Sequence, residues 1–245
     1  MSYLYIYDGS SFSCHAYSDF KEKEEYVLGR WSPEYQPDIC FGFEFCDMNI
    51  RQGRITVYHN NLYYSEGLNR LPAQFNNHII SEETFPIGVT GNIVNVFSFM
   101  QRDENNPNEV FPAAFMFSSP ETHIWGDYNI YEAFYNKRDR FQNGFFEEWE
   151  CCDQLKIRGD ILESDLVLED APYDFLTFYS IEGERDYRLC ISEEVQNKFC
   201  QVNDDNEVVP FESNSALKPD RTYRFIYDDK YLFIFGGQIL LYARL

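Results

Sequence analysis

Short stretches that alternate large apolar residues with small or polar ones occur along most of the chain, separated by turns rich in Asn, Asp and Gly. In residues 39–45 every second position is Ile or Phe. Alternate residues of a β-strand face the same side of a sheet, so this pattern buries one face. Residues 54–58 and 62–64 flank an Asn-containing turn at 59–61, which is typical of a hairpin because Asn tolerates positive φ angles. These features predict a mainly β fold.

The same patterns predict further strands in both halves of the chain. The apolar C-terminal residues 239–243 favour an inner strand, and the turns share chemistry but no fixed period, so no repeat is predicted. The predicted strands and hairpins lie at residues 3–7 and 12–17, 87–100, 110–117, 175–180 with 187–191, 198–202 with 207–210, and 222–227 with 231–235 and 238–243.

One segment in the middle has helical spacing. Asp127 is a suitable N-cap for a helix that would bury Ile130 and Phe134, and Phe145 to Leu155 would continue as a second short helix. The predicted fold class is therefore mainly β with a small helical insert (α+β), with antiparallel sheets in a sandwich-like or barrel-like arrangement.

The length of 245 residues fits either one large β domain or two smaller ones. We favour two β-rich domains, with the boundary between Ser118 and Gly126. Residues 1–120 would form a β-rich N-terminal domain, and residues 121–245 a C-terminal domain in which the helices precede a β-meander. A single domain remains the alternative.

The charge of the chain is strongly negative. Asp and Glu number 41 against 20 Lys and Arg, which gives a net charge of −21 and a pI near 4.4. The excess is shared, with net −9 in residues 1–125 and net −12 in residues 126–245. Such a field repels phosphate backbones and anionic lipids, and it attracts cations. It therefore favours a basic protein partner over duplex nucleic acid or a membrane.

Aromatic residues make up 18% of the chain. Phe, Tyr and Trp favour strands and fill the space between sheets, and Tyr is also enriched on recognition surfaces. We expect most of them in the core and a minority on a binding face.

The N-terminus has no basic residue or cleavage site of a signal peptide, and no apolar run is long enough to span a membrane. We therefore expect a cytoplasmic protein, or one in the host cytosol if it is viral or injected. An odd number of cysteines without a C-x-x-C pair favours reduced thiols, several of them as small core residues. The cysteines are Cys14, Cys40, Cys46, Cys151, Cys152, Cys190 and Cys200.

Short motifs for common cofactors and nucleophiles are missing from the sequence. It contains no phosphate-binding loop, no G-x-G-x-x-G and no G-x-S-x-G. The four His lack the spacing that places two imidazoles on one metal, and Cys14 and His15, as neighbours on a strand, would face opposite sides. The sequence therefore predicts no cofactor and no metal site.

Three functions stay open, and we favour the first. It is a non-enzymatic, acidic binding protein of the inhibitor or immunity type, which captures a basic partner such as a nuclease or another nucleic-acid-binding protein. The alternatives are a carboxylate-based hydrolase with a site assembled across strands, and a β-barrel that binds an apolar ligand. Oligomeric state is left open.

The candidate partner-binding residues are acidic clusters with an aromatic anchor beside them. Glu147, Glu148 and Glu150 around Trp149 also suit the acid and base of a glycosidase, and Asn203 to Glu207 also fits a plain hairpin turn. The full set is Glu147, Glu148, Trp149, Glu150, Glu163, Asp165, Glu169, Asp170, Tyr173, Asp204, Asp205 and Glu207.

Overall fold

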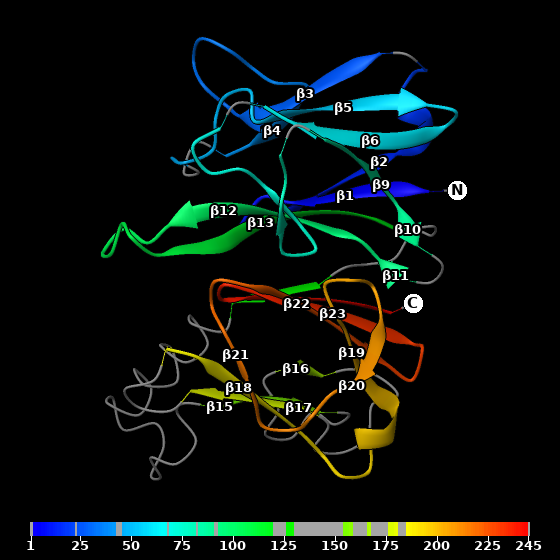
Figure 1. Cartoon of the computed structure of the whole chain (residues 1–245), viewed down its shortest axis with the longest axis vertical. Coiled ribbons are helices and arrows are strands. Elements are labelled where there is room, and N and C mark those ends of the chain that lie inside the picture. The colour runs from blue at the N-terminus through cyan, green and yellow to red at the C-terminus, as the bar shows by residue number, and fades with distance from the viewer. Residues whose placement is uncertain are drawn as a thin grey trace. The chain divides into compact units, whose positions relative to one another are not determined.

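β-Sheets with mostly antiparallel pairing account for nearly all the regular structure of the described residues (Figure 1). A computed structural model describes residues 2–22, 24–42, 46–67, 69–81, 83–90, 93–119, 126–129, 154–158, 166–167, 176–180 and 185–244. Within these ranges there is no α-helix, and the two helical turns are the 3-10 helices η1 (Tyr17–Asp19) and η3 (Gln196–Lys198).

The strands fall into two groups along the chain. The first group comprises β1 (Tyr3–Tyr7), β2 (Phe12–Ala16), β3 (Glu25–Arg30), β4 (Ile39–Phe41), β5 (Gly53–Tyr58), β6 (Asn61–Glu66), β7 (Gln74–Phe75), β8 (His78–Ile79), β9 (Thr84–Ile87), β10 (Val89–Thr90), β11 (Ile93–Val94), β12 (Val96–Arg102) and β13 (Val110–Ser119). The second group comprises β14 (Gly126–Asn129), β15 (Gln154–Arg158), β16 (Leu166–Val167), β17 (Leu176–Ser180), β18 (Tyr187–Ile191), β19 (Phe199–Val202), β20 (Val208–Pro210), β21 (Ser215–Leu217), β22 (Thr222–Tyr227), β23 (Tyr231–Gly236) and β24 (Ile239–Arg244).

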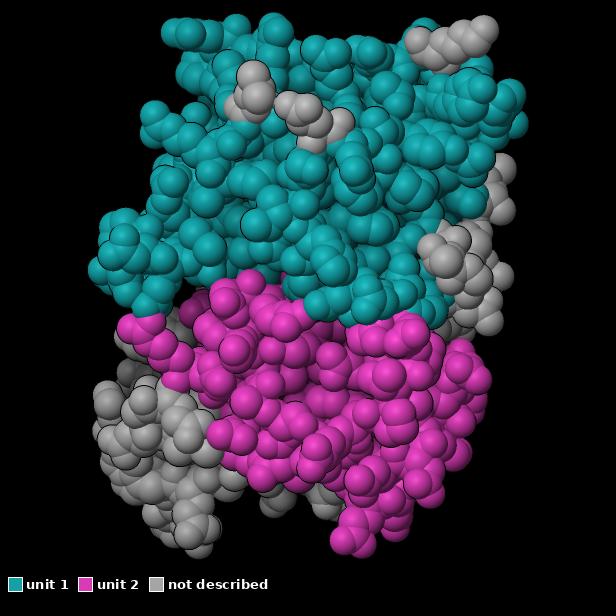
Figure 2. All heavy atoms as spheres, viewed as in Figure 1, with its two compact units in different colours: residues 1–124, 204–206 teal, residues 125–203, 207–245 magenta. Residues whose placement is uncertain are grey.

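The chain divides into two compact units, coloured separately in Figure 2. Unit 1 comprises residues 1–124 together with 204–206, and unit 2 comprises residues 125–203 and 207–245. Each unit has its own hydrophobic core cluster.

Unit 1 is a β-sandwich. One sheet has the strand order β2-β1-β13-β12-β7-β8 and the other β4-β3-β5-β6-β9, with the two-stranded hairpin β10-β11 beside them. Side chains of both sheets meet in one core, where the ring centroids of Phe41 and Phe99 lie 5.1 Å apart and those of Tyr64 and Phe97 lie 5.2 Å apart. Edge-to-face and tilted aromatic pairs fill the space between the two layers. The high aromatic content of the sequence predicted this use of the rings in the core.

Unit 2 is a second sandwich with an equally aromatic core. Its sheets have the orders β14-β24-β23-β22-β19-β20 and β16-β15-β17-β18-β21. Phe178 of one sheet contacts Phe235 of the other at a centroid distance of 5.4 Å, and Tyr187 meets the same ring edge-on at 5.6 Å.

The two five-stranded sheets repeat one topology. Numbered in chain order within each sheet, the strands of both run 2-1-3-4-5, and in both the first two strands are parallel while the remaining pairs are antiparallel. The turns of the sequence have no fixed period, and no repeat was predicted from them. The two sheets share strand order and strand direction. These properties do not require residues that recur at a fixed spacing in the sequence.

The hairpins predicted from local turn chemistry are confirmed. His59 and Asn60 have φ angles of 50° and 59° in the β5–β6 turn, and Asn206 has a φ of 64° in the β19–β20 turn. Gly237, with a φ of 59°, lies in the β23–β24 turn. Strand β24 lies between β14 and β23, so the prediction of an inner C-terminal strand is also confirmed.

The predicted helix is wrong where the structure describes its ends. Asp127 is not a helix cap, because it lies in β14 opposite Leu241 of β24. Leu155, expected in the second helix, lies in β15 opposite Phe178. Pairing with strands distant in sequence outweighs the local helical spacing at both ends. Residues 130–153 lie outside the described ranges.

The cysteine prediction is partly wrong. Five cysteines are free thiols in the described part of the chain, but none of these five is a core residue, because four are exposed and Cys200 is half-buried. Cys190 lies on an outward-facing position of β18, so alternation along the strand accounts for its exposure, and Cys14 lies on the edge strand β2. Cys151 and Cys152 lie outside the described ranges. No helix in the described residues is long and apolar enough to cross a membrane.

Candidate functional site

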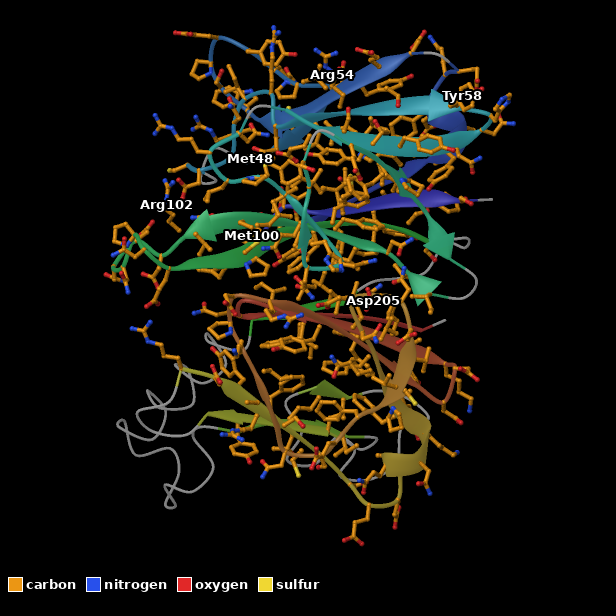
Figure 3. The ribbon with its side chains drawn as sticks, in the orientation of Figure 1. Met48, Arg54, Tyr58, Met100, Arg102 and Asp205 are labelled. Carbon is orange, nitrogen blue, oxygen red and sulfur yellow. The ribbon has the colours of Figure 1, made fainter. Side chains whose placement is uncertain are left out.

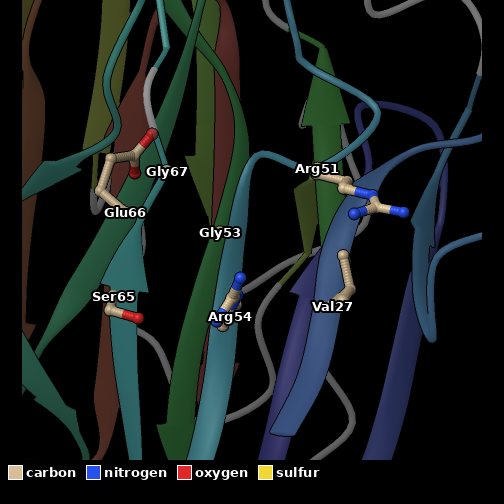
Figure 4. Close-up of a pocket in the computed structure, with 7 residues that line it drawn as sticks. All are labelled: Val27, Arg51, Gly53, Arg54, Ser65, Glu66 and Gly67. Carbon is tan, nitrogen blue, oxygen red and sulfur yellow. The ribbon is translucent and has the colours of Figure 1, made fainter.

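A pocket of about 350 Å³ opens on unit 1 where β5 begins and β6 ends. Figure 4 shows its lining, with Arg51 and Val27 on one side of Arg54, and Ser65 and Glu66 on the other. Gly53 and Gly67 complete it. We call it the β5–β6 pocket.

Strand register places the floor of this pocket. Val27 of β3 lies opposite Arg54 of β5, and Arg54 in turn lies opposite Ser65 of β6. Cross-strand neighbours share one face of a sheet, and the exposed position of Arg54 shows that this face is directed away from the core. Figure 3 shows Arg54 and Tyr58 along β5.

Glycines permit close approach of the backbone around the pocket. A Cβ atom at Gly53 would lie 2.4 Å from the Tyr64 hydroxyl oxygen, and one at Gly67 would lie 2.9 Å from the Gln52 carbonyl oxygen. The Gly67 N–H donates to that same carbonyl at 2.8 Å. The residues that follow β6 are thereby held against the start of β5.

Glu66 is the most heavily hydrogen-bonded side chain of the pocket. Tyr64 Oη donates to its Oε2 at 2.7 Å, Gln52 Nε2 donates to its Oε1 at 2.6 Å, and the Asn69 amide donates to the same Oε1. The Ala73 N–H is a further donor. Burial raises the pKa of the Glu66 carboxyl above its ordinary value of 4.5, while these donors act in the opposite direction. Glu66 is therefore a structural carboxylate that ties β6 to the segment after it.

The hydrogen bond to Glu66 and the burial of Tyr64 also change the pKa of the Tyr64 hydroxyl. Tyr64 is fully buried, and burial together with the adjacent Glu66 carboxylate raises the pKa of its hydroxyl well above the ordinary value. Tyr64 consequently stays neutral and keeps its proton for the hydrogen bond to Glu66.

The two arginines of the pocket differ in their partners. Arg54 Nη1 lies 3.1 Å from Glu25 Oε2, in a pair whose side chains are both more than half exposed. The guanidinium carbon of Arg51 lies 4.6 Å from the centroid of the Tyr35 ring. Among the residues that the structure describes, no carboxylate lies within ion-pair distance of Arg51.

The turn that carries Tyr35 is itself well ordered by hydrogen bonds. Ser32 and Tyr35 exchange backbone hydrogen bonds of 3.1 and 3.2 Å, and the Ser32 hydroxyl accepts a further bond from the Tyr35 N–H at 3.1 Å. Tyr35 is therefore held in place, and its ring supports the Arg51 guanidinium through a cation–π contact.

Chemically, the pocket suits anion binding more than catalysis. Its lining contains Ser65 but neither His nor Cys, and the donors around Glu66 hold that carboxylate in place. Across the described ranges, no group of three His, Cys, Asp or Glu side chains is placed to hold a metal ion.

Only three of the twelve predicted partner-binding residues are described. Asp205 and Glu207 are exposed and Asp204 is half-buried, in the turn between β19 and β20 labelled at Asp205 in Figure 3. The Asn203 side chain accepts a bond from the Glu207 N–H at 2.8 Å and donates to its carboxylate at 3.1 Å. The hairpin interpretation of this segment is thus confirmed. Its role in partner binding stays a prediction.

Asp204 has a structural role that the sequence did not indicate. It accepts a hydrogen bond of 2.8 Å from the Asn77 side chain, within unit 1 as defined above. The nine other predicted residues lie outside the described ranges. They are Glu147, Glu148, Trp149, Glu150, Glu163, Asp165, Glu169, Asp170 and Tyr173.

Sequence reasoning missed the β5–β6 pocket. Arg51 and Arg54 flank a Gln-Gly pair in a chain where acids outnumber bases two to one, and this local concentration of positive charge was the available signal. Their proximity to Ser65 and Glu66 depends on the pairing of β5 with β6, which the hairpin prediction contained.

Comparison with known proteins adds little. No protein-family model matches the chain, and no curated protein matches it. Two solved structures with weak similarity contain FHA domains. The FhaA FHA domain, complexed with the intracellular domain of Rv3910, is 13% identical with a TM-score of 0.32 and covers 49% of this chain and 100% of its own. The N-terminal FHA domain of EssC, a component of the bacterial Type VII secretion apparatus, is 10% identical with a TM-score of 0.33 and covers 100% of this chain and 92% of its own. Scores this low carry no argument about function.

Proposed function

We propose that this chain is a non-enzymatic binding protein that captures a basic protein partner, in the manner of an inhibitor or immunity protein. The observation that carries the proposal is the acid excess in both halves of the chain, net −9 and net −12. A negative field of this extent speeds the encounter with a cationic surface and disfavours nucleic acid.

The described part of unit 2 adds an acidic cluster that the sequence analysis did not select. Glu193 and Glu194 follow β18, and Glu212 precedes Ser213. The Ser213 hydroxyl accepts a hydrogen bond from the Ile191 N–H at 3.0 Å and so holds the two segments together. All three glutamates are exposed, and none is in an ion pair among the described residues. This cluster is available to a cationic partner.

The test begins with capture of a partner from the native host by the immobilised full chain, followed by its purification. Association is then measured over a range of salt concentrations. We expect a basic partner bound in a fixed ratio, with an association rate that falls as salt rises.

Charge reversal then locates the contact surface. Glu193→Lys with Glu194→Lys, and separately Asp205→Lys, are compared with Glu104→Lys, an exposed loop position of unit 1 used as the control. Reversal at the contact should slow association and reduce its salt dependence, whereas the control should do neither. Repeated turnover of a substrate, abolished by one carboxylate substitution that leaves the protein folded, would establish the hydrolase alternative instead.

A further inference from the structure

Gly53, Arg54 and Glu66 of the β5–β6 pocket are not requirements of the sheet topology, because the matching sheet of unit 2 has other residues at their positions. Leu28 of β3 pairs with the first residue of β4 and with Gly53 of β5. Ile157 of β15 pairs likewise with the first residue of β16 and with Leu176 of β17. Leu176 is therefore the equivalent of Gly53.

Extending this register to the next strand gives further equivalents. Glu66 lies opposite Gly53, and Ile191 lies opposite Leu176, so a buried Ile replaces the hydrogen-bonded Glu. Thr177 is likewise the equivalent of Arg54. Unit 2 thus has apolar core residues where unit 1 has a glycine and a carboxylate. At these compared positions, the glycine and the carboxylate are features of unit 1 and not of the shared topology.

We propose that the β5–β6 pocket binds a carboxylate of an acidic peptide segment on a protein partner, with Arg51 as its principal ligand. A guanidinium presents a planar fork of N–H donors that matches a carboxylate. Tyr35 already orients this fork at the pocket, and no carboxylate of the described residues occupies it. Preorganisation of this kind reduces the entropic cost of binding.

The remaining charges at the pocket favour binding of one group that carries a single negative charge. Arg54 is paired with Glu25, and the four donors to Glu66 come from neutral groups. Two arginines and two carboxylates therefore lie at or beside the pocket, and among the described residues Arg51 is the one of these four without an ion-pair or hydrogen-bond partner. A carboxylate matches that single cation, whereas a doubly charged phosphate ester would bring a second negative charge beside Glu25.

The Arg54–Glu25 pair can contribute to binding without opposing it. Exposed ion pairs are worth at most about 1 kcal/mol, so Arg54 can exchange Glu25 for a ligand carboxylate at little cost. The Ser65 hydroxyl on the same face offers one further donor. This site is separate from the acidic surface proposed above, and it does not depend on the basic partner.

The experiment is an NMR titration of the ¹⁵N-labelled full chain with the peptide Ac-Gly-Asp-Glu-Asp-Gly-NH₂. The matched uncharged peptide is Ac-Gly-Asn-Gln-Asn-Gly-NH₂, and about 150 mM salt screens the negative field of the whole protein. We expect saturable shifts of the Gly53, Ser65 and Gly67 amides with the acidic peptide alone. Equal shifts with the uncharged peptide, or no saturation, would overturn the proposal.

Three variants assign the effect to Arg51. Arg51→Gln should weaken binding by about fivefold or more, since one charged hydrogen-bonding partner is lost. Tyr35→Leu should weaken it through loss of the supporting ring. Lys21→Gln, the same charge change at an exposed residue paired with Glu24, should leave affinity unchanged. Arg51 is exposed, so Arg51→Gln is expected to fold, which its spectrum verifies.

Inorganic phosphate provides the remaining comparison. It is titrated under the same conditions, and we expect it to bind more weakly than the acidic peptide. Tighter binding of phosphate that is lost in Arg51→Gln would refute the choice of a carboxylate ligand. Unchanged affinity of the acidic peptide in Arg51→Gln would refute the assignment of Arg51.

Discussion

Gly53 is the residue at which β5 passes closest to the buried side chain of Tyr64. A Cβ atom at this position would lie 2.4 to 2.5 Å from the hydroxyl oxygen and two ring carbons of Tyr64. Tyr64 is fully buried against Phe97 and Phe99, so its ring has no free space to enter. The absence of a side chain at residue 53 and the large side chain at residue 64 are therefore mutually required.

Gly53→Ala should destabilise the protein by about 1 to 3 kcal/mol, the usual cost of overpacking a core. Gly88→Ala is the matched control, because a Cβ there meets nothing within 4 Å and the backbone is outside the left-handed region. The control should be neutral or slightly stabilising, since alanine restricts the unfolded chain. Chemical denaturation of both variants measures the difference. Equal stability of the two variants would show that Tyr64 moves freely.

Glu66 predicts a pH dependence of stability with a definite sign. Its folded-state pKa lies above the ordinary value of 4.5 because of burial, so the folded protein keeps this proton to higher pH than the unfolded chain does. The resulting stabilisation of the folded state is complete at pH values below 4.5, and it is lost as the pH rises through the pKa of the folded state. Glu66→Gln cannot titrate. The stability of the wild type relative to this variant should therefore fall as the pH rises above 4.5. A difference that is constant or rises with pH would contradict the direction of the shift.

Among the elements, hairpins were predictable and sheet order was not. A hairpin depends on a few adjacent residues, such as the Asn-containing turns of β5–β6 and β19–β20, so its signal is local. The parallel pairing of β3 with β4, and the β14–β24 pairing across more than 100 residues, depend on contacts that no short window contains. The helix cap expected at Asp127 is wrong for this reason, because that residue lies in β14 and pairs with β24.

The β5–β6 turn provides a prediction at the scale of one element. Asn60 has a φ of 59° and an exposed side chain, so its identity matters through the backbone alone. Asn60→Val should cost about 1 to 2 kcal/mol, because a β-branched residue is strained in the left-handed region. Asn60→Gly should lower the free energy of unfolding by a few tenths of a kcal/mol at most, since glycine adopts this conformation freely. Thermal or chemical unfolding distinguishes the two, and a larger loss for Gly than for Val would disprove the backbone explanation.

At the scale of the whole molecule, the composition of the sequence predicted the class of fold. It did not predict that the two five-stranded sheets share one strand order. Alternation and aromatic content indicated packed sheets, and the two sandwiches confirm this. The candidate site was harder to predict, because Val27, Arg54 and Ser65 become neighbours only after β3, β5 and β6 are in register. The net charge favoured acidic clusters as the binding site. The described residues also include a pocket with an arginine, Arg51, that has no ion-pair partner among them.

Two separate cores predict two independently folding domains. Residues 1–124 contain every strand of the unit 1 sandwich, and residues 125–245 contain every strand of unit 2. We expect each fragment, expressed alone, to give a dispersed NMR spectrum and a cooperative unfolding transition, because each buries its own aromatic core. Fragment 1–102 is the control. It lacks β13, which lies between β1 and β12, and should not fold. If fragment 1–124 is as unfolded as fragment 1–102, the two units form one cooperative domain, which was the single-domain alternative.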